Sequence, residues 1–182
     1  MNKIFYIAFL LLFCFGCAKK KSDKNTHNPA IDSLSFFLEK ANDYDLEVPK
    51  RKLYTEKAFE LVLNQENDSM QRVNLFRVAN RFFNLDNIIG YKEAVDKVLD
   101  KSILAKDSLS TSKAYSYLGD FYDAKNVSDS AYSNYFKAEK MYSNLQDNVN
   151  LAKSRLRKAR LQYNESDLQG AEKSVFSAIR AL

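Results

Sequence analysis

The sequence predicts an all-α protein, an α-solenoid of about four antiparallel helix hairpins, on three observations. The 182 residues include only 4 Gly and 2 Pro, so residues that interrupt helices are scarce. Apolar residues recur at the i, i+3, i+4, i+7 spacing of one helix face. This pattern repeats with a period of 40 residues, which indicates a repeat architecture. The 46% hydrophobic content suffices for the core of one domain.

Residues 1–17 have the pattern of an export signal. Lys3 supplies the positive start, and an apolar run of 13 residues, 4–16, precedes Cys17. At ~1.5 Å per residue this run spans roughly 20 Å, which is less than the ~30 Å hydrocarbon core of a bilayer. We therefore expect a cleaved signal peptide and not a lasting membrane span.

The end of this leader resembles the lipobox of bacterial lipoproteins, in which a small residue precedes a cysteine that is acylated and becomes residue one. Gly16 matches the small position, whereas Cys14 and Phe15 depart from the usual Leu and Ala or Ser. The resemblance implies lipidation of Cys17. With Ala18 in place of an Asp, it also implies an outer-membrane lipoprotein that faces the periplasm. The alternative is an ordinary signal peptide with two incidental cysteines.

Residues 18–30 are expected to form a flexible tether, because they are rich in polar residues and show no apolar periodicity. The first 24 residues contribute +4 of the formal charge of +5, which leaves +1 for the rest of the chain. A nucleic-acid-binding protein needs a basic face to neutralise phosphates. The charge distribution therefore indicates no nucleic-acid partner.

Residues 31–182 are expected to form the repeat domain. Small or apolar residues occupy the same columns at the 40-residue offset: Ala79, Gly119 and Ala159; Tyr91, Ala131 and Ala171; Val95, Tyr135 and Val175; Val98, Ala138 and Ala178. Helices are expected at 31–43, 51–64, 69–84, 90–104, 109–124, 128–144, 148–164 and 168–181. Ser128 is the expected N-cap of the sixth helix.

The fourth repeat leaves its register open. The 40-residue period places Arg155 and Lys158 at core positions, unless a slip by one residue brings Leu156 and Tyr163 inward.

The third repeat resembles a tetratricopeptide repeat (TPR). Its large-aromatic, Leu-Gly, Tyr, Ala, aromatic, Ala pattern is carried by Tyr115, Leu118, Gly119, Tyr122, Ala131, Tyr135 and Ala138. The departures are the 40-residue period in place of the usual 34, and Ser143 where the family has Pro. Longer helices would account for the period. We predict that Gly119 and Ala131 are positions where helices approach closely.

The resemblance implies that the first helix of each hairpin lines a concave groove that binds a protein or peptide. The corresponding positions are Val73, Phe76, Asn80, Phe83, Asn84, Lys113, Ser116, Asp120, Asp123, Lys153, Arg160 and Asn164. The Lys and Asn set with which some TPR domains clamp a C-terminal carboxylate is not matched, because Asp120 stands where repeat two has Asn80. A groove of mixed polar and aromatic residues suits an extended protein segment.

The sequence gives no indication of an enzyme, a metal site or a cofactor. His27 is the single histidine and lies in the expected tether, and the zinc-protease, nucleotide and dinucleotide motifs are missing from the sequence. Asp120 and Asp123 could suggest an acid/base pair, but a solvated acidic face is the preferred interpretation.

Four Asp-Ser pairs precede an apolar or small residue, at positions 32–33, 68–69, 107–108 and 129–130. Helix capping explains their places near expected helix starts and is the favoured interpretation. The alternative is O-glycosylation, because the triplets resemble an acceptor motif of some bacterial periplasmic systems.

Two functions compete. The leading hypothesis is a non-catalytic outer-membrane lipoprotein scaffold that presents a TPR groove to a protein partner. The alternative is the periplasmic sensor portion of a truncated TPR-containing signalling or transcription-regulatory protein. It is favoured by an apolar end helix without a polar cap, whose exposed face would comprise Val175, Phe176, Ile179 and Leu182 and promote self-association. A carbohydrate-uptake lipoprotein is a weaker third idea, because such proteins are much longer.

Overall fold

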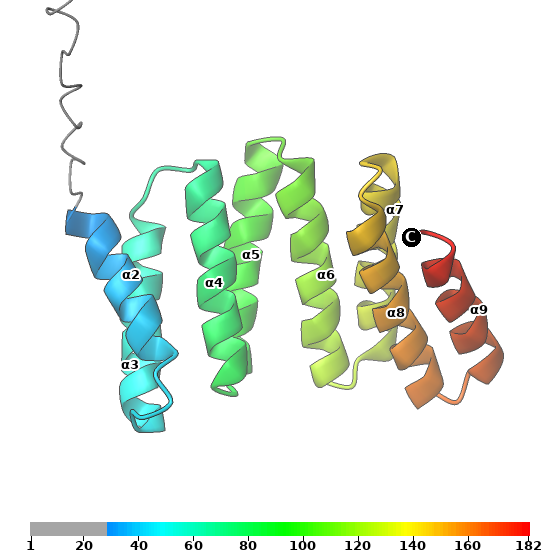
Figure 1. Cartoon of the computed structure of the whole chain (residues 1–182), viewed down its shortest axis with the longest axis horizontal. Helices are drawn as coiled ribbons and strands as arrows, with labels where there is room; N and C mark the ends of the chain where they lie inside the picture. Colours follow the sequence, from blue (N-terminus) through cyan, green and yellow to red (C-terminus); the bar gives the residue numbers. More distant parts are fainter. Residues whose placement is uncertain (1–28) are drawn as a thin grey trace, which may run out of the picture.

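The computed structural model describes residues 29–182 (Figure 1), and all regular secondary structure in this range is α-helical. The eight helices are α2 (Pro29–Ala41), α3 (Val48–Leu63), α4 (Ser69–Asn84), α5 (Ile88–Leu104), α6 (Ser108–Ala124), α7 (Ser128–Asn144), α8 (Asn148–Asn164) and α9 (Leu168–Ile179). The predicted ranges agree with these to within three residues, and the predicted fold class is confirmed. The predicted leader, Cys17, His27 and the tether through residue 28 lie outside the described residues.

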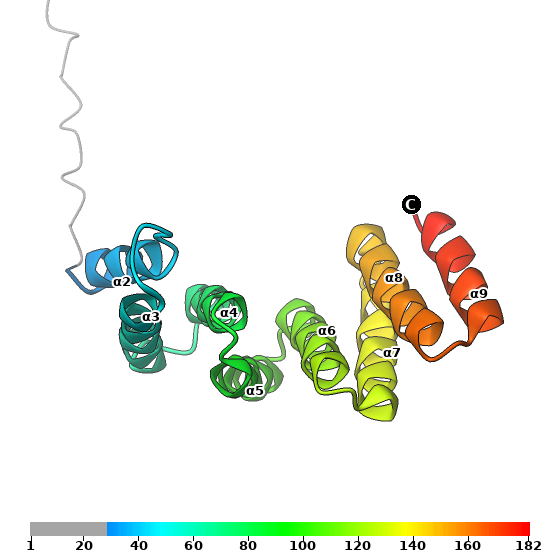
Figure 2. The same ribbon diagram turned by 90° about the horizontal axis from the view of Figure 1, so that it is seen from below.

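The helices form a curved array in which each helix packs mainly on the helices that precede and follow it. Figure 2 shows α2, α4, α6 and α8 along the inner side of the curve and α3, α5 and α7 along the outer side. We call the first set the inner layer. It consists of the first helices of the four hairpins, so the topology places the predicted groove on the inner side.

Five turns share one backbone conformation and account for the period. In each turn one residue has a positive φ of 54 to 63°, and the next residue's N–H donates to the carbonyl five residues earlier, as in Asn87 N to Phe82 O at 2.9 Å. This is the Schellman arrangement that ends a helix. The residues with positive φ follow one another at intervals of 20: Asp86, Lys106, Asn126, Gln146 and Ser166. One repeat of 40 residues is therefore two equivalent helix-and-turn units.

Side-chain caps begin most of the helices. Asp68 accepts a hydrogen bond from Gln71 N at 2.7 Å and Asp107 accepts one from Ser110 N at 3.0 Å, so the capping interpretation is confirmed at two of the four Asp-Ser pairs. It is wrong at the other two, because residue 32 lies within α2 and Asp129 lies in the first turn of α7. Asn87, Asp147 and Asp167 also cap helices.

The expected cap of α7 is also wrong. Val127 occupies the N-cap position, which makes Ser128 the first helical residue. The Ser128 hydroxyl instead donates to Glu165 Oε1 at 2.5 Å. This hydrogen bond joins the start of α7 to the end of α8.

The hydrophobic core is largest in the first three hairpins, where one cluster extends from Leu34 to Phe121. Two smaller clusters, around Tyr135 and Tyr142 of α7, join the third hairpin to Leu161 and Leu151 of the fourth. Gly119 lies against Tyr135: a Cβ at residue 119 would overlap the Tyr135 ring and would lie 3.0 Å from its Cγ. Ala131 is fully buried. Both predicted close-packing positions are confirmed.

The fourth repeat keeps the 40-residue register. Leu156 and Tyr163 are exposed, so the alternative slip does not occur. Arg155 and Lys158 are largely buried and both bind Glu139 of α7, at 2.8 and 2.6 Å. A carboxylate from the preceding hairpin therefore makes two cations acceptable at positions that are apolar in the other repeats.

Candidate functional site

Most of the predicted groove residues are accessible on α4, α6 and α8 of the inner layer. Lys113, Asp120 and Asp123 are partly buried. The exposed members are Val73, Asn80, Phe83, Asn84, Lys153, Arg160 and Asn164.

Two of the predicted groove residues are buried, and this part of the prediction is wrong. Phe76 and Ser116 each expose only 3% of their surface. The Phe76 ring packs edge-on against Tyr117, with ring centroids 5.0 Å apart, and the Lys113 amine lies 4.3 Å from its centroid. Phe76 therefore fills the space between α4 and α6 and is not available to a partner.

Ion pairs join the third and fourth hairpins across the inner layer. Asp120 Oδ1 accepts from Arg157 Nε and from the Tyr135 hydroxyl, each at 2.9 Å, and Arg160 pairs with Asp123 at 2.5 Å. Burial raises the pKa of Asp120, and this effect exceeds the opposing effect of the Arg157 charge. The interpretation of Asp120 and Asp123 as a solvated acidic face is therefore wrong, because both carboxylates are held by arginines.

Two lysines of the inner layer remain without a carboxylate. Lys113 of α6 and Lys153 of α8 occupy the same register position, and neither forms an ion pair within residues 29–182. Burial lowers the pKa of Lys113, and the charge of Lys153 lowers it further. The negative charge of an incoming anionic group would oppose both effects, because it stabilises the protonated amine.

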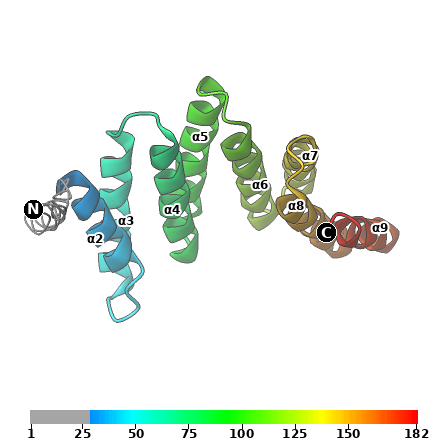
Figure 3. The ribbon, with the colours of Figure 1, turned by 45° about the horizontal axis from the view of Figure 1, so that its top comes forward.

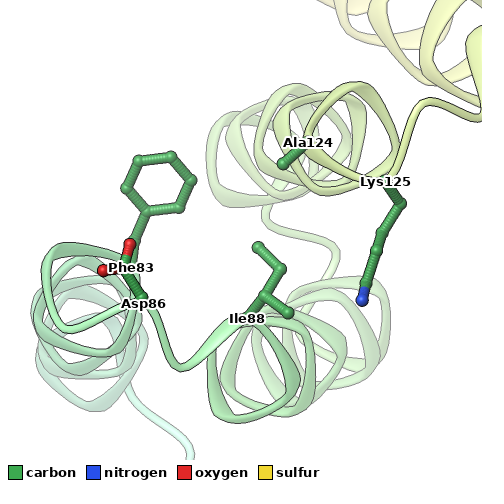
Figure 4. A pocket seen from close by; sticks show the side chains of 5 residues that line it. All are labelled: Phe83, Asp86, Ile88, Ala124 and Lys125. Atoms are coloured by element: carbon green, nitrogen blue, oxygen red, sulfur yellow. The ribbon is translucent and has the colours of Figure 1, made fainter.

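The inner layer also contains two small hollows. One, of about 260 Å³, is lined by Lys153, Leu156, Arg157 and Arg160. The second, which we call the notch, measures about 240 Å³ and lies where the second and third hairpins meet, as Figure 4 shows. Its lining residues are Phe83, Asp86, Ile88, Ala124 and Lys125.

The prediction missed most of these lining residues. Whether Leu156 and Arg157 face the groove depended on the register of the fourth repeat, which the sequence left open. Ile88, Ala124 and Lys125 lie at helix ends, whereas the groove prediction considered only the faces of the first helices. Comparing the 40-residue columns at the helix ends could have found them.

The described residues contain no group of three or more His, Cys, Asp or Glu side chains that could hold a metal ion. None of the helices in 29–182 is long and apolar enough to cross a membrane. The inner layer offers shallow polar and apolar contacts along α4, α6 and α8, and the ammonium groups of Lys113 and Lys153 form no ion pair within residues 29–182.

The last helix presents the expected apolar face, which we call the C-terminal face. Figure 3 shows α9 at the opposite end of the array from α2. The exposed fractions rise from 37% at Val175 to 54% at Phe176, 61% at Ile179 and 80% at Leu182. Their exposure is confirmed, whereas self-association through this face stays a prediction.

No protein-family model and no curated protein matches the sequence. Two solved structures resemble the fold. The crystal structure of BtubC (BKLC) from P. vanneervenii is 18% identical with a TM-score of 0.68, and the match covers 87% of this chain and 66% of that one. The apo form of RapI is 15% identical with a TM-score of 0.68, and the match covers 97% of this chain and 61% of that one.

These matches show a helical-repeat fold of TPR-like architecture. The chain spans less than two thirds of the length of either matched structure. At these identities the likeness shows the fold alone.

Proposed function

We propose that the chain is a non-catalytic scaffold that binds an extended segment of a protein partner along the inner layer. The observation that carries the proposal is the juxtaposition of two unpaired cations, Lys113 and Lys153, with exposed apolar side chains on neighbouring helices. Two hollows, of about 240 and 260 Å³, are smaller than the ~300 to 1,000 Å³ of typical small-molecule sites, and a third of about 370 Å³, where α7 begins and α8 ends, lies at the low end of that range. A polypeptide can occupy several such shallow sites at once.

Photo-crosslinking from defined positions tests this proposal. A photoreactive amino acid at Asn84 or Lys153, both exposed on the inner layer, should give adducts with a partner protein in cells. The same amino acid at Lys97 of α5 or Lys140 of α7, exposed on the outer layer, should give several-fold fewer. Equal adduct formation from both layers would contradict an inner-layer groove.

We further propose that the scaffold is an outer-membrane lipoprotein, anchored through Cys17 and facing the periplasm. The leader pattern and Gly16 before Cys17 support this proposal. A diacylated cysteine with an additional amide-linked chain buries far more methylene groups than a single myristoyl chain, which gives only marginal binding. The anchor would therefore be stable.

Lipidation of Cys17 has a direct test. Incorporation of a fatty-acid analogue should be lost in Cys17→Ser, because the thiol carries the lipid, and should be kept in Cys14→Ser. Gel fluorescence of the labelled chain measures both. Label that persists in Cys17→Ser would exclude this attachment site.

The second candidate is the periplasmic sensor portion of a longer TPR-containing signalling or transcription-regulatory protein. The exposed C-terminal face favours it, because a further segment or a second copy of the chain would cover that apolar surface. Analytical ultracentrifugation distinguishes these outcomes: self-association that Ile179→Lys weakens supports the C-terminal face as an interface. A stable monomer that binds no hydrophobic dye removes the argument.

A further inference from the structure

The notch is an open cavity of mixed polar and apolar lining, at the point where α4 and α6 end. Phe83 from the last turn of α4, Ile88 from the start of α5 and Ala124 from the end of α6 border the same space, with Asp86 and Lys125 at its rim (Figure 4). Phe83 leaves 45% of its surface exposed there. Apolar surface therefore faces solvent in a concave site, where a ligand group could cover it.

Hydrogen bonds and ring packing hold the walls of the notch in place. Asn87 accepts from Gly90 N and donates from its backbone to Phe82 O, each at 2.9 Å, which fixes the turn beside Ile88. The Phe83 ring packs 5.2 Å from the Tyr91 ring. A site that is already ordered before its ligand arrives loses little conformational entropy on binding.

The equivalent position one repeat later is polar. There the Ser128 hydroxyl donates to Glu165 and Arg160 binds Asp123, each at 2.5 Å. The residues 40 positions after those of the notch are Asp123, Asn126, Ser128, Asn164 and Glu165. A hollow of about 370 Å³ lies there too, but most of its lining residues are polar or charged: Ser128, Asp129, Tyr132, Leu161, Gln162, Glu165 and Asp167. The apolar wall of the notch is therefore specific to Phe83, Ile88 and Ala124.

We propose that the notch binds one large aliphatic or aromatic side chain from an extended segment of the partner. This proposal rests on the proposed scaffold function and specifies its ligand. A volume of about 240 Å³ accommodates a single side chain, so the rest of the segment must continue outside the notch.

The same segment carries a carboxylate about five residues from the apolar side chain. Lys113 and Ala124 both lie on α6 and are separated by roughly 16 Å at ~1.5 Å per residue, which about five residues of extended chain span at ~3.3 Å each. Lys113 is half-buried against the Phe76 ring, and it shares its register position with Lys153. Charge complementarity therefore selects an acidic partner segment over a basic one.

Selection from a display library of random short peptides tests this pairing, with the full chain in detergent as bait. The selected peptides should share a large apolar residue about five positions from Asp or Glu. Ala124→Leu fills the notch and should weaken these peptides at least about tenfold. Ala105→Leu, the same change at the exposed C-cap of α5 in the outer layer, should leave affinity within about twofold.

Two further variants test the notch and the preference for acidic residues separately. Phe83→Ser removes a wall of the notch and should also weaken the peptides, and the Lys113→Ser, Lys153→Ser double variant should remove the preference for acidic residues. Peptides that bind the inner layer but are insensitive to Ala124→Leu and Phe83→Ser would overturn the notch proposal and leave the scaffold function standing. Failure of the wild-type chain to select any peptide would count against both.

Discussion

Replacement of Gly119 by leucine should destabilise the domain by about 1 to 3 kcal/mol, the usual cost of overpacking a core. The first added atom already overlaps the Tyr135 ring, and Tyr135 is fully buried. The ring cannot turn away freely, because it is surrounded by other side chains and its hydroxyl donates to Asp120. Thermal unfolding should shift down by about 3 to 10 °C.

Two further variants separate packing from other effects of the substitution. Gly119→Ala adds only the Cβ and gains roughly 1 kcal/mol of helix propensity, so a lower melting temperature in this variant isolates the clash with Tyr135. Ser133→Leu adds the same leucine at an exposed position of α7 and should change stability by less than about 0.5 kcal/mol. A Gly119→Ala protein that melts at a higher temperature than the wild type would show that the Tyr135 ring can move to make room for the Cβ.

The sequence could predict the contact of Gly119 with Tyr135 because both belong to columns that repeat every 40 residues. Periodic small and large residues report how neighbouring helices pack, and that packing is the same in every repeat. The five turns also repeat along the chain. No glycine marks them in the sequence, because the residues with positive φ are of other types, such as Lys106 and Gln146. The 20-residue spacing of polar caps such as Asp147 and Asp167 was the available signal.

The binding surface was less predictable because it depends on side chains that differ between repeats. Phe76 and Ser116 share a register position with Leu156, yet the first two are buried and Leu156 is exposed. The fourth hairpin has a smaller core, so it leaves this column uncovered. A family pattern transfers the backbone positions of a groove, whereas burial of each side chain depends on its neighbours in space.

Replacement of Glu139 by glutamine should destabilise the domain by about 2 to 3 kcal/mol. The neutral amide would leave Arg155 and Lys158 without a countercharge while their side chains remain only 20% and 13% exposed. The cost stays below the roughly 3 to 5 kcal/mol for a fully buried pair, since water still reaches part of each group. Arg155 also donates to Ser177 O at 2.8 Å, so its displacement would loosen α9. Chemical denaturation of the two proteins measures the difference.

The control for this variant is Asp96→Asn, which breaks the exposed Lys92–Asp96 pair of α5 and should cost less than about 1 kcal/mol. The effect of Glu139 should also depend on pH. Burial opposes ionisation of Glu139, but hydrogen bonds from Lys158 and Arg155 prevail and lower its pKa below the ordinary 4.5. Its contribution is therefore complete above about pH 4.5 and is lost as the pH falls through the lowered pKa of the folded state.

The stability difference between the wild type and Glu139→Gln should accordingly be constant from pH 7 to about pH 5 and narrow at lower pH. Other carboxylates, such as Asp107 with its lowered pKa, also reduce stability in acid, but they do so equally in both proteins. The difference between the two curves therefore isolates residue 139. A difference that stays constant down to pH 3 would mean that the loss comes from packing of the amide and not from the missing charge.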